Sequence, residues 1–192
     1  MRKIDERKKQ LIEQAILVIT KEEGIQGLSF GKIAKHAQVS SGTPYVYYKD
    51  KTDMLSKMFL QTKTLFDDHL QADIDRGKTI SDRLFEGVMH FARMYTNYPL
   101  QAIFITAIRA NPGLVTKEAL DYGNRSAQPL NDLFDEAVKS DALITTNIEE
   151  ATVLLFGPFL MLIQERLSAN QDARLDELET VIHHSVDGIL KK

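Results

Sequence analysis

The sequence predicts an all-α protein of about nine helices, and three observations support this fold class. Apolar residues recur at helical spacing, as in Ile80, Leu84, Val88, Phe91 and Tyr95. No stretch shows the alternation of a half-buried strand, and no solenoid-length repeat or low-complexity tract is present. The 192 residues are 43% hydrophobic, which is enough to build one or two small domains with real cores.

The chain begins with a basic, amphipathic segment. Residues 4–23 are predicted to form the first helix, because their apolar residues share one face and Gly24 can end the helix. This helix should pack on two shorter helices and so complete a three-helix head. Arg2 and Lys3 precede it and could reach DNA as an arm.

Two short helices joined by a tight turn are predicted next. Ser29 is expected to cap the first, Val39 lies in the turn, and Ser40 is expected to cap the second. The second helix carries hydroxyl and tyrosine side chains, which can donate to phosphates and base edges. This arrangement predicts a helix-turn-helix, whose second helix enters the major groove of DNA.

This segment resembles the DNA-binding signature of the TetR/AcrR family of bacterial one-component repressors. The matching positions are Ile33, Ala34, Val39, Ser40, Gly42, Thr43, Tyr45, Tyr47, Tyr48, Lys49, Lys51 and Leu55. Pro44 departs from the pattern, since the family usually has another apolar residue there. The resemblance covers the N-terminal quarter, and beyond it only architecture and length agree. It implies a homodimeric DNA-binding regulator with an inducer site in its C-terminal region. The plainer alternative is a helical hairpin whose tyrosines only pack.

The resemblance and the spacing together give a set of candidate DNA contacts. Thr43, Tyr45 and Lys51 are expected to contact phosphate, whereas Ser41 and Tyr47 are expected to face base edges. The complete candidate set is Lys32, Ser40, Ser41, Thr43, Tyr45, Tyr47, Lys49 and Lys51.

Charge is distributed unevenly along the chain, which carries a net charge of −3. Residues 1–58 contain 11 Lys and Arg against 7 Asp and Glu, giving +4. The remaining residues contain 13 against 20, giving −7. A basic head on an acidic body is expected when only the head meets phosphate.

The rest of the chain is predicted to be a helical bundle. We expect a DNA-binding domain at residues 1–50 and an effector-binding and dimerisation domain at residues 51–192. Pro129 should kink or split the long helix in which it lies. The helices of the second domain are predicted at residues 51–75, 80–96, 99–109, 116–140, 147–167 and 172–190.

The last two of these helices predict a homodimer. The helix at residues 147–167 is apolar almost all round, so it should be buried on two sides, one of them against a second copy. The alternative is a fully internal helix in a monomer. Pro158 should bend the helix and leaves the register of the interface open. The candidate interface residues are Val153, Gly157, Leu160, Leu178, Ile182 and Ile189.

Aromatic residues in the predicted bundle suggest a binding site for a small apolar or amphiphilic effector. The candidate residues are Phe66, His69, Phe91, Tyr95, Phe104 and Tyr122. Taken one at a time, these side chains fit a solid core equally well. The family resemblance is what favours a pocket.

The sequence offers no catalytic constellation. It lacks cysteine, and it has no glycine-rich phosphate loop, zinc-binding His-Glu-x-x-His helix or serine nucleophile elbow. His183 and His184 are adjacent, so on a helix they point about 100° apart and cannot share a metal. We therefore expect neither an enzyme nor a metal or cofactor site. No signal peptide or bilayer-length apolar run is evident, and a cytoplasmic location is expected.

These observations together predict a DNA-binding transcriptional regulator, a ligand-released repressor that acts as a homodimer on a palindromic operator. The alternative is a helical adaptor with the same architecture that works through a protein partner rather than a small inducer.

Overall fold

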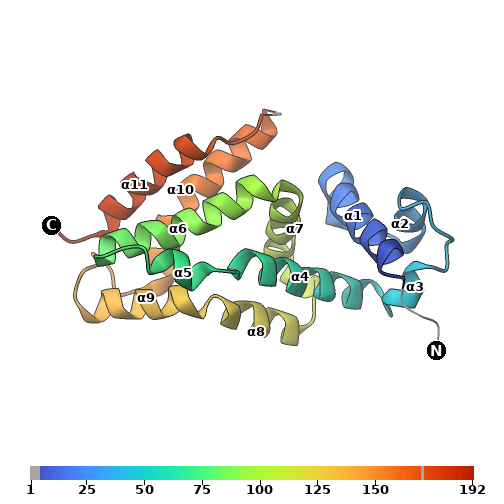
Figure 1. Ribbon diagram of the computed structural model, residues 1–192, viewed down its shortest axis with the longest axis horizontal. Coiled ribbons are helices and arrows are strands. Elements are labelled where there is room, and N and C mark those ends of the chain that lie inside the picture. The colour runs from blue at the N-terminus through green and yellow to red at the C-terminus, as the bar shows by residue number, and fades with distance from the viewer. Residues whose placement is uncertain (1–4, 170) are drawn as a thin grey trace. The chain divides into compact units, whose positions relative to one another are not determined.

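The computed structural model describes residues 5–169 and 171–192, in which helices are joined by turns and loops (Figure 1). The described residues contain no β-strand, and one isolated bridge pairs Leu143 with Leu190. The all-α prediction is confirmed. The elements are α1 (Glu6–Glu23), η1 (Ile25–Gly27), α2 (Phe30–His36), α3 (Pro44–Tyr47), α4 (Lys51–Asp67), α5 (Leu70–Ile74), α6 (Ile80–Asn97), α7 (Pro99–Ala110), η2 (Pro112–Leu114), α8 (Lys117–Ser126), α9 (Gln128–Lys139), α10 (Ile148–Ser168) and α11 (Leu175–Ile189).

The described chain contains eleven α-helices rather than nine, because two predicted helices are divided. The helix predicted at residues 51–75 stops at Asp67, and His69 adopts a left-handed conformation with φ of 62° before α5 begins. The prediction of one continuous helix over residues 51–75 was therefore wrong. The division near Pro129 is confirmed: Pro129 lies in the first turn of α9, where its missing N–H costs no hydrogen bond.

Packing divides the chain into two compact units. The first consists of Met1–Leu65 and Tyr98–Arg125, and the second of Phe66–Asn97 and Ser126–Lys192. These units differ from the predicted division at residue 50, which was drawn by function and stays a prediction.

The first unit is built around α1. Asp5 caps this helix by accepting a hydrogen bond from the Lys8 backbone N–H at 3.2 Å. Its apolar face, which includes the fully buried Ile12 and Ile16, packs against α2, η1 and α7. A Cβ on Gly123 of α8 would come within 2.7 Å of the Phe59 ring, so glycine lets α8 approach α4 closely.

The second unit is built around α6, which packs against α5, α9, α10 and α11 (Figure 1). Its core contains the fully buried Leu84 and Val88 of α6. Arg83 of the same helix makes two hydrogen bonds to the Glu136 carboxylate of α9, at 2.7 and 2.9 Å. The Phe85 ring stacks on the His183 imidazole of α11 with 4.0 Å between ring centres. Apolar burial and these polar contacts together fix the helices around α6.

Candidate DNA-binding interface

The helix-turn-helix begins with a well-capped α2. The Ser29 hydroxyl accepts a hydrogen bond from the Lys32 backbone N–H at 3.3 Å, which confirms the expected cap. The helix ends at His36, and two residues later Gln38 has a left-handed φ of 53°. The N–H groups of Gln38 and Val39 return to the carbonyls of Lys35 and Ala34, which is the hydrogen-bond pattern of a Schellman motif. The turn is thus fixed by backbone hydrogen bonds as well as by Val39.

The second helix is shorter than expected. It begins at Pro44 rather than directly after Ser40, so the prediction of Ser40 as its cap was wrong. A turn precedes it, in which the Thr43 N–H donates to the Ser40 carbonyl at 2.8 Å and the two hydroxyls lie 2.7 Å apart. Proline suits the first helical position because it has no N–H to satisfy. Ser41 and Thr43 therefore belong to a turn that leads into α3.

The aromatic residues of α3 and its end fall into two groups. Tyr45 is 63% exposed and meets the Phe30 ring edge-on, with ring centres 4.5 Å apart. Tyr48 is buried, and its hydroxyl donates to the Glu13 carboxylate at 3.5 Å. Burial, followed by the Glu13 charge, raises the pKa of Tyr48 well above its usual value. Tyr48 is thus a neutral anchor, whereas Tyr45 is available at the surface.

Tyr47 and Val46 are the other two residues of α3 whose side chains bear on DNA contact. The Tyr47 hydroxyl donates to the backbone carbonyl of Asp5 at 2.9 Å, which ties α3 to the start of α1. A contact between this hydroxyl and a base edge, as proposed, would have to form while the hydroxyl still donates to Asp5. Val46, which was not among the candidates, is 52% exposed. Sequence reasoning missed Val46 because valine is common in protein cores and does not by itself indicate DNA contact. Tyr45 and Tyr47 on either side of it have hydroxyl groups that do.

The lysine candidates flank the start of α4. Asp50 accepts a hydrogen bond from the Asp53 N–H at 2.8 Å, and Asp53 accepts one from the Lys49 N–H at 2.9 Å. Lys57 also donates to Asp53, at 2.8 Å. Burial alone would raise the pKa of Asp53, but the hydrogen bonds from Lys57 and Lys49 outweigh it and lower that pKa. This network fixes the Lys49 backbone beside the first turn of α4, which begins at Lys51. That end of a helix is its positive end and favours phosphate.

Three basic residues remain, namely Lys32 and the two residues of the proposed arm. Lys32 forms an ion pair with Glu23, so a phosphate would have to compete with that carboxylate. Arg2 and Lys3, the proposed arm, lie outside the described residues.

The candidate effector residues do not fall in one unit. Phe66, Phe91 and Tyr95 belong to the second unit, and the rings of Phe66 and Tyr95 meet edge-on with 5.4 Å between ring centres. His69 also belongs to the second unit but is exposed at the break between α4 and α5. The first unit holds the other two candidates, the buried Phe104 and the half-exposed Tyr122.

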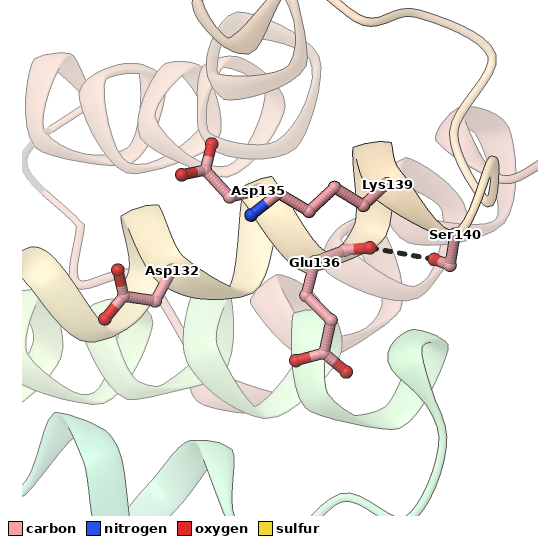
Figure 2. A pocket seen from close by; sticks show the side chains of 5 residues that line it. All are labelled: Asp132, Asp135, Glu136, Lys139 and Ser140. Carbon is pink, nitrogen blue, oxygen red and sulfur yellow. Dashed lines mark hydrogen bonds between the residues drawn. The ribbon is translucent and has the colours of Figure 1, made fainter.

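An open depression of about 510 Å³ lies along α9 (Figure 2). All of its lining residues are exposed and come from α9 or its C-cap residue Ser140, and Glu136 is already paired with Arg83. Its lining residues are Asp132, Asp135, Glu136, Lys139 and Ser140, none of which was a candidate. Within the described residues, no group of three or more His, Asp or Glu is placed to hold a metal ion.

The candidate dimer residues divide by burial. Val153 is 64% exposed and Gly157 and Leu160 are partly exposed. The three candidates on α11 are fully buried inside the subunit, namely Leu178, Ile182 and Ile189. Of the six candidates, those on α10 are therefore the ones that a partner could contact. By length and composition α10 could cross a membrane, yet such a helix also occurs in soluble proteins, and α10 packs against α11 and α6.

Comparison with known proteins agrees with the motif. Residues 12–58 match the family of bacterial regulatory proteins called the tetR family. Over 75 residues the chain is 36% identical to the fatty acid metabolism regulator protein of Bacillus subtilis, which covers 39% of this chain and 38% of that protein. Over 56 residues it is 38% identical to an uncharacterised helix-turn-helix regulator of Haemophilus influenzae, covering 29% and 30%. The chain thus spans less than two fifths of the curated relatives that it matches.

Solved structures extend the likeness to the whole fold. A TetR-family regulator from Marinobacter aquaeolei superposes with a TM-score of 0.84 at 22% identity, covering 100% of both chains. The regulator FadR from Bacillus subtilis, solved in complex with stearoyl-CoA, gives 0.75 at 22% identity, covering 94% of this chain and 99% of that one. Residues 12–58 thus match the tetR family, and the chain as a whole shares the fold of these solved regulators.

Proposed function

We propose that this protein is a transcriptional regulator that binds a palindromic operator as a homodimer and releases it when a small effector binds. The observation that carries the proposal is the construction of the helix-turn-helix. Its turn and α3 expose Ser41, Tyr45 and Val46, while Tyr48 and Pro44 anchor the same segment from below. An exposed recognition segment on a buried support fits a groove-binding element.

Electrostatics support DNA as the partner of this surface. Residues 1–58 carry a net charge of +4, from 11 Lys and Arg against 7 Asp and Glu, although the whole chain carries −3. Lys49 and Lys51 stand at the amino end of α4, where backbone N–H groups also favour an anion. Lys51, Thr43 and Tyr45 are proposed to contact phosphate, and Ser41 to face base edges together with Val46, whose methyl groups suit a thymine methyl.

The exposed side of α10 supports the homodimer. Val153 and Met161 are 64% and 67% exposed, although both are large and apolar. Gly157 lies between them at helical spacing, and a Cβ built on it would meet nothing within 4 Å. An apolar stripe of this kind on a water-soluble helix favours a partner, and a two-fold operator requires a second copy. The proposed interface is therefore the Val153, Gly157 and Leu160 side of α10.

The proposed effector is a small apolar or amphiphilic molecule. Aromatic candidates cluster within the second unit, where the Phe91 ring lies 5.5 Å from that of Phe156 and the Tyr95 ring lies 6.2 Å from that of Phe159. One similar protein is named as a fatty acid metabolism regulator, and one similar fold was solved with stearoyl-CoA. Long-chain fatty acyl thioesters are therefore the first compounds to test. A soluble regulator of this kind is proposed to work in the cytoplasm.

The test is a selection of DNA sequences by the purified protein, followed by anisotropy titrations with the selected duplex. We expect a palindromic site whose affinity falls as the salt concentration rises. Addition of a long-chain acyl thioester should release the DNA, and by linkage the DNA-bound protein should bind that compound less tightly. Selection of no sequence, with DNA binding absent at low salt, would favour the adaptor alternative.

A further inference from the structure

A buried charged cluster lies at the junction of α4, α5 and α6, within the second unit. The His90 ring of α6 is 1% exposed, and both of its nitrogens have partners. Nδ1 lies 2.8 Å from the Asp73 carboxylate of α5, and Nε2 lies 2.8 Å from the backbone carbonyl of Phe66 near the end of α4. None of the DNA-binding or effector proposals uses this histidine.

The two partners decide the charge of the ring. A backbone carbonyl only accepts hydrogen bonds, and so does an ionised carboxylate. A neutral imidazole has one N–H and one lone pair, so it can satisfy only one of two acceptors. Both contacts at 2.8 Å require either two N–H groups on His90 or a proton on Asp73.

The surroundings of Asp73 exclude the second arrangement. Its carboxylate also accepts a hydrogen bond from Arg93 at 3.0 Å and pairs with Arg76 at 2.8 Å. Burial alone would raise the pKa of Asp73, but the hydrogen bonds from His90 and Arg93 and the Arg93 charge lower it. The carboxylate is therefore ionised, and His90 supplies both protons as an imidazolium.

The position of the Phe66 carbonyl explains what this cation does. The last carbonyls of an α-helix have no partner within the helix, and cations near them are favoured by the helix dipole. α4 ends at Asp67, the residue after Phe66. Two residues further on, His69 adopts a left-handed backbone conformation. His90 thus caps the carboxyl end of α4 and ties it to α5 through Asp73.

We propose that Asp73, His90 and the Phe66 carbonyl form a charged lock on the α4–α5 junction, which holds while His90 is doubly protonated and loosens when rising pH removes one proton. With a single N–H left, the ring must present a lone pair to one of its two acceptors. That contact becomes repulsive, and the last turn of α4 loses its cap. This inference does not depend on the DNA-binding proposal.

Other charged groups on α6 and on the neighbouring helices already have hydrogen-bond or ring partners. On α6 itself, Glu86 accepts a hydrogen bond from Arg93 at 3.3 Å. Groups on the neighbouring helices have partners of their own: Asp67 of α4 pairs with Ser126, Glu136 of α9 with Arg83, Arg166 of α10 with Glu177, and His183 of α11 with Phe85. Loss of one proton from His90 is therefore the step that breaks the lock.

Nitrogen NMR of the histidine side chains in the wild-type protein tests the charge directly. At neutral pH the His90 ring should show two protonated nitrogens. A ring with one protonated nitrogen and one lone pair would overturn the proposal. This measurement needs no variant and therefore does not depend on how a variant folds.

Hydrogen exchange tests the consequence. Between mildly acidic and mildly alkaline pH, amide opening at residues 66–74 should increase after correction for the intrinsic rate. His90→Gln, which cannot carry the second proton, should open this segment by about tenfold more at neutral pH and abolish its pH dependence. His184→Gln, at an exposed position of α11, is the matched control and should leave the segment unchanged. Equal, pH-independent opening in all three proteins would contradict the lock.

Discussion

The helix-turn-helix and α10 both present surfaces to solvent, but they expose opposite kinds of side chain. Around α3 the exposed residues are mostly hydroxyl-bearing or cationic, with Tyr45 and Lys49 as examples. Along α10 the exposed residues include Val153 and Met161, whose apolar side chains form no hydrogen bonds with water. A polar surface on a rigid support suits a charged partner such as DNA, whereas an apolar stripe suits a second copy of the chain.

The largest expected effect comes from a charge on the apolar stripe. Val153→Glu should weaken the dimer by at least about 100-fold, because a carboxylate would be desolvated without a partner. Sedimentation should then show monomer, and operator affinity should fall with it. Ile148→Glu adds the same charge at an exposed position that lies about 140° from Val153 around α10, and it serves as the control. A Val153→Glu protein that remains dimeric would place the interface elsewhere.

A smaller effect is expected in the polar region. Lys51→Ala should weaken binding to all DNA sequences alike and reduce the salt slope by about one unit, because one phosphate contact is lost. Anisotropy titrations over a range of salt concentrations measure this. Lys139→Ala, at an exposed position of α9, should leave the slope unchanged. A changed sequence preference with an intact slope would mean that Lys51 reads bases.

These two surfaces also differ in how well the sequence predicted them. The helix-turn-helix was found because its chemistry lies in residue types at fixed spacing, from Ser29 to Lys51. The early end of α4 was missed because a left-handed conformation at His69 leaves no signal in the apolar pattern. Similarly, Leu178 and Leu160 have the same side chain, and only the packing shows that one is buried and the other partly exposed.

Acid should destabilise the first unit through Asp53. Its pKa is lowered in the folded protein, so the carboxylate contributes stability above its unfolded pKa of about 4. That contribution is lost as pH falls through the folded value. Thermal melts should show a smaller loss of stability in acid for Asp53→Asn than for the wild type. An equal loss in both proteins would mean that other carboxylates cause the acid sensitivity.

The smallest expected effect concerns the support under α3. Tyr47→Phe removes the hydrogen bond to the Asp5 carbonyl and should lower the free energy of unfolding by about 1 kcal/mol. Denaturant melts measure this change. If the hydroxyl only supports the fold, relative affinities for different operators should stay the same. A shift in base preference would restore Tyr47 to the groups that read the operator.

The most direct test of the account is the stoichiometry of the protein on a selected operator. Sedimentation velocity of the duplex with wild-type protein should show two copies per palindromic site, and half of the palindrome should bind far more weakly. Val153→Glu should lose the two-copy complex, whereas Lys51→Ala should keep the dimer and bind DNA less tightly. A single wild-type copy bound with full affinity, or a wild-type dimer that binds no duplex, would contradict the assignment of the polar surface to DNA and of the apolar stripe to self-association.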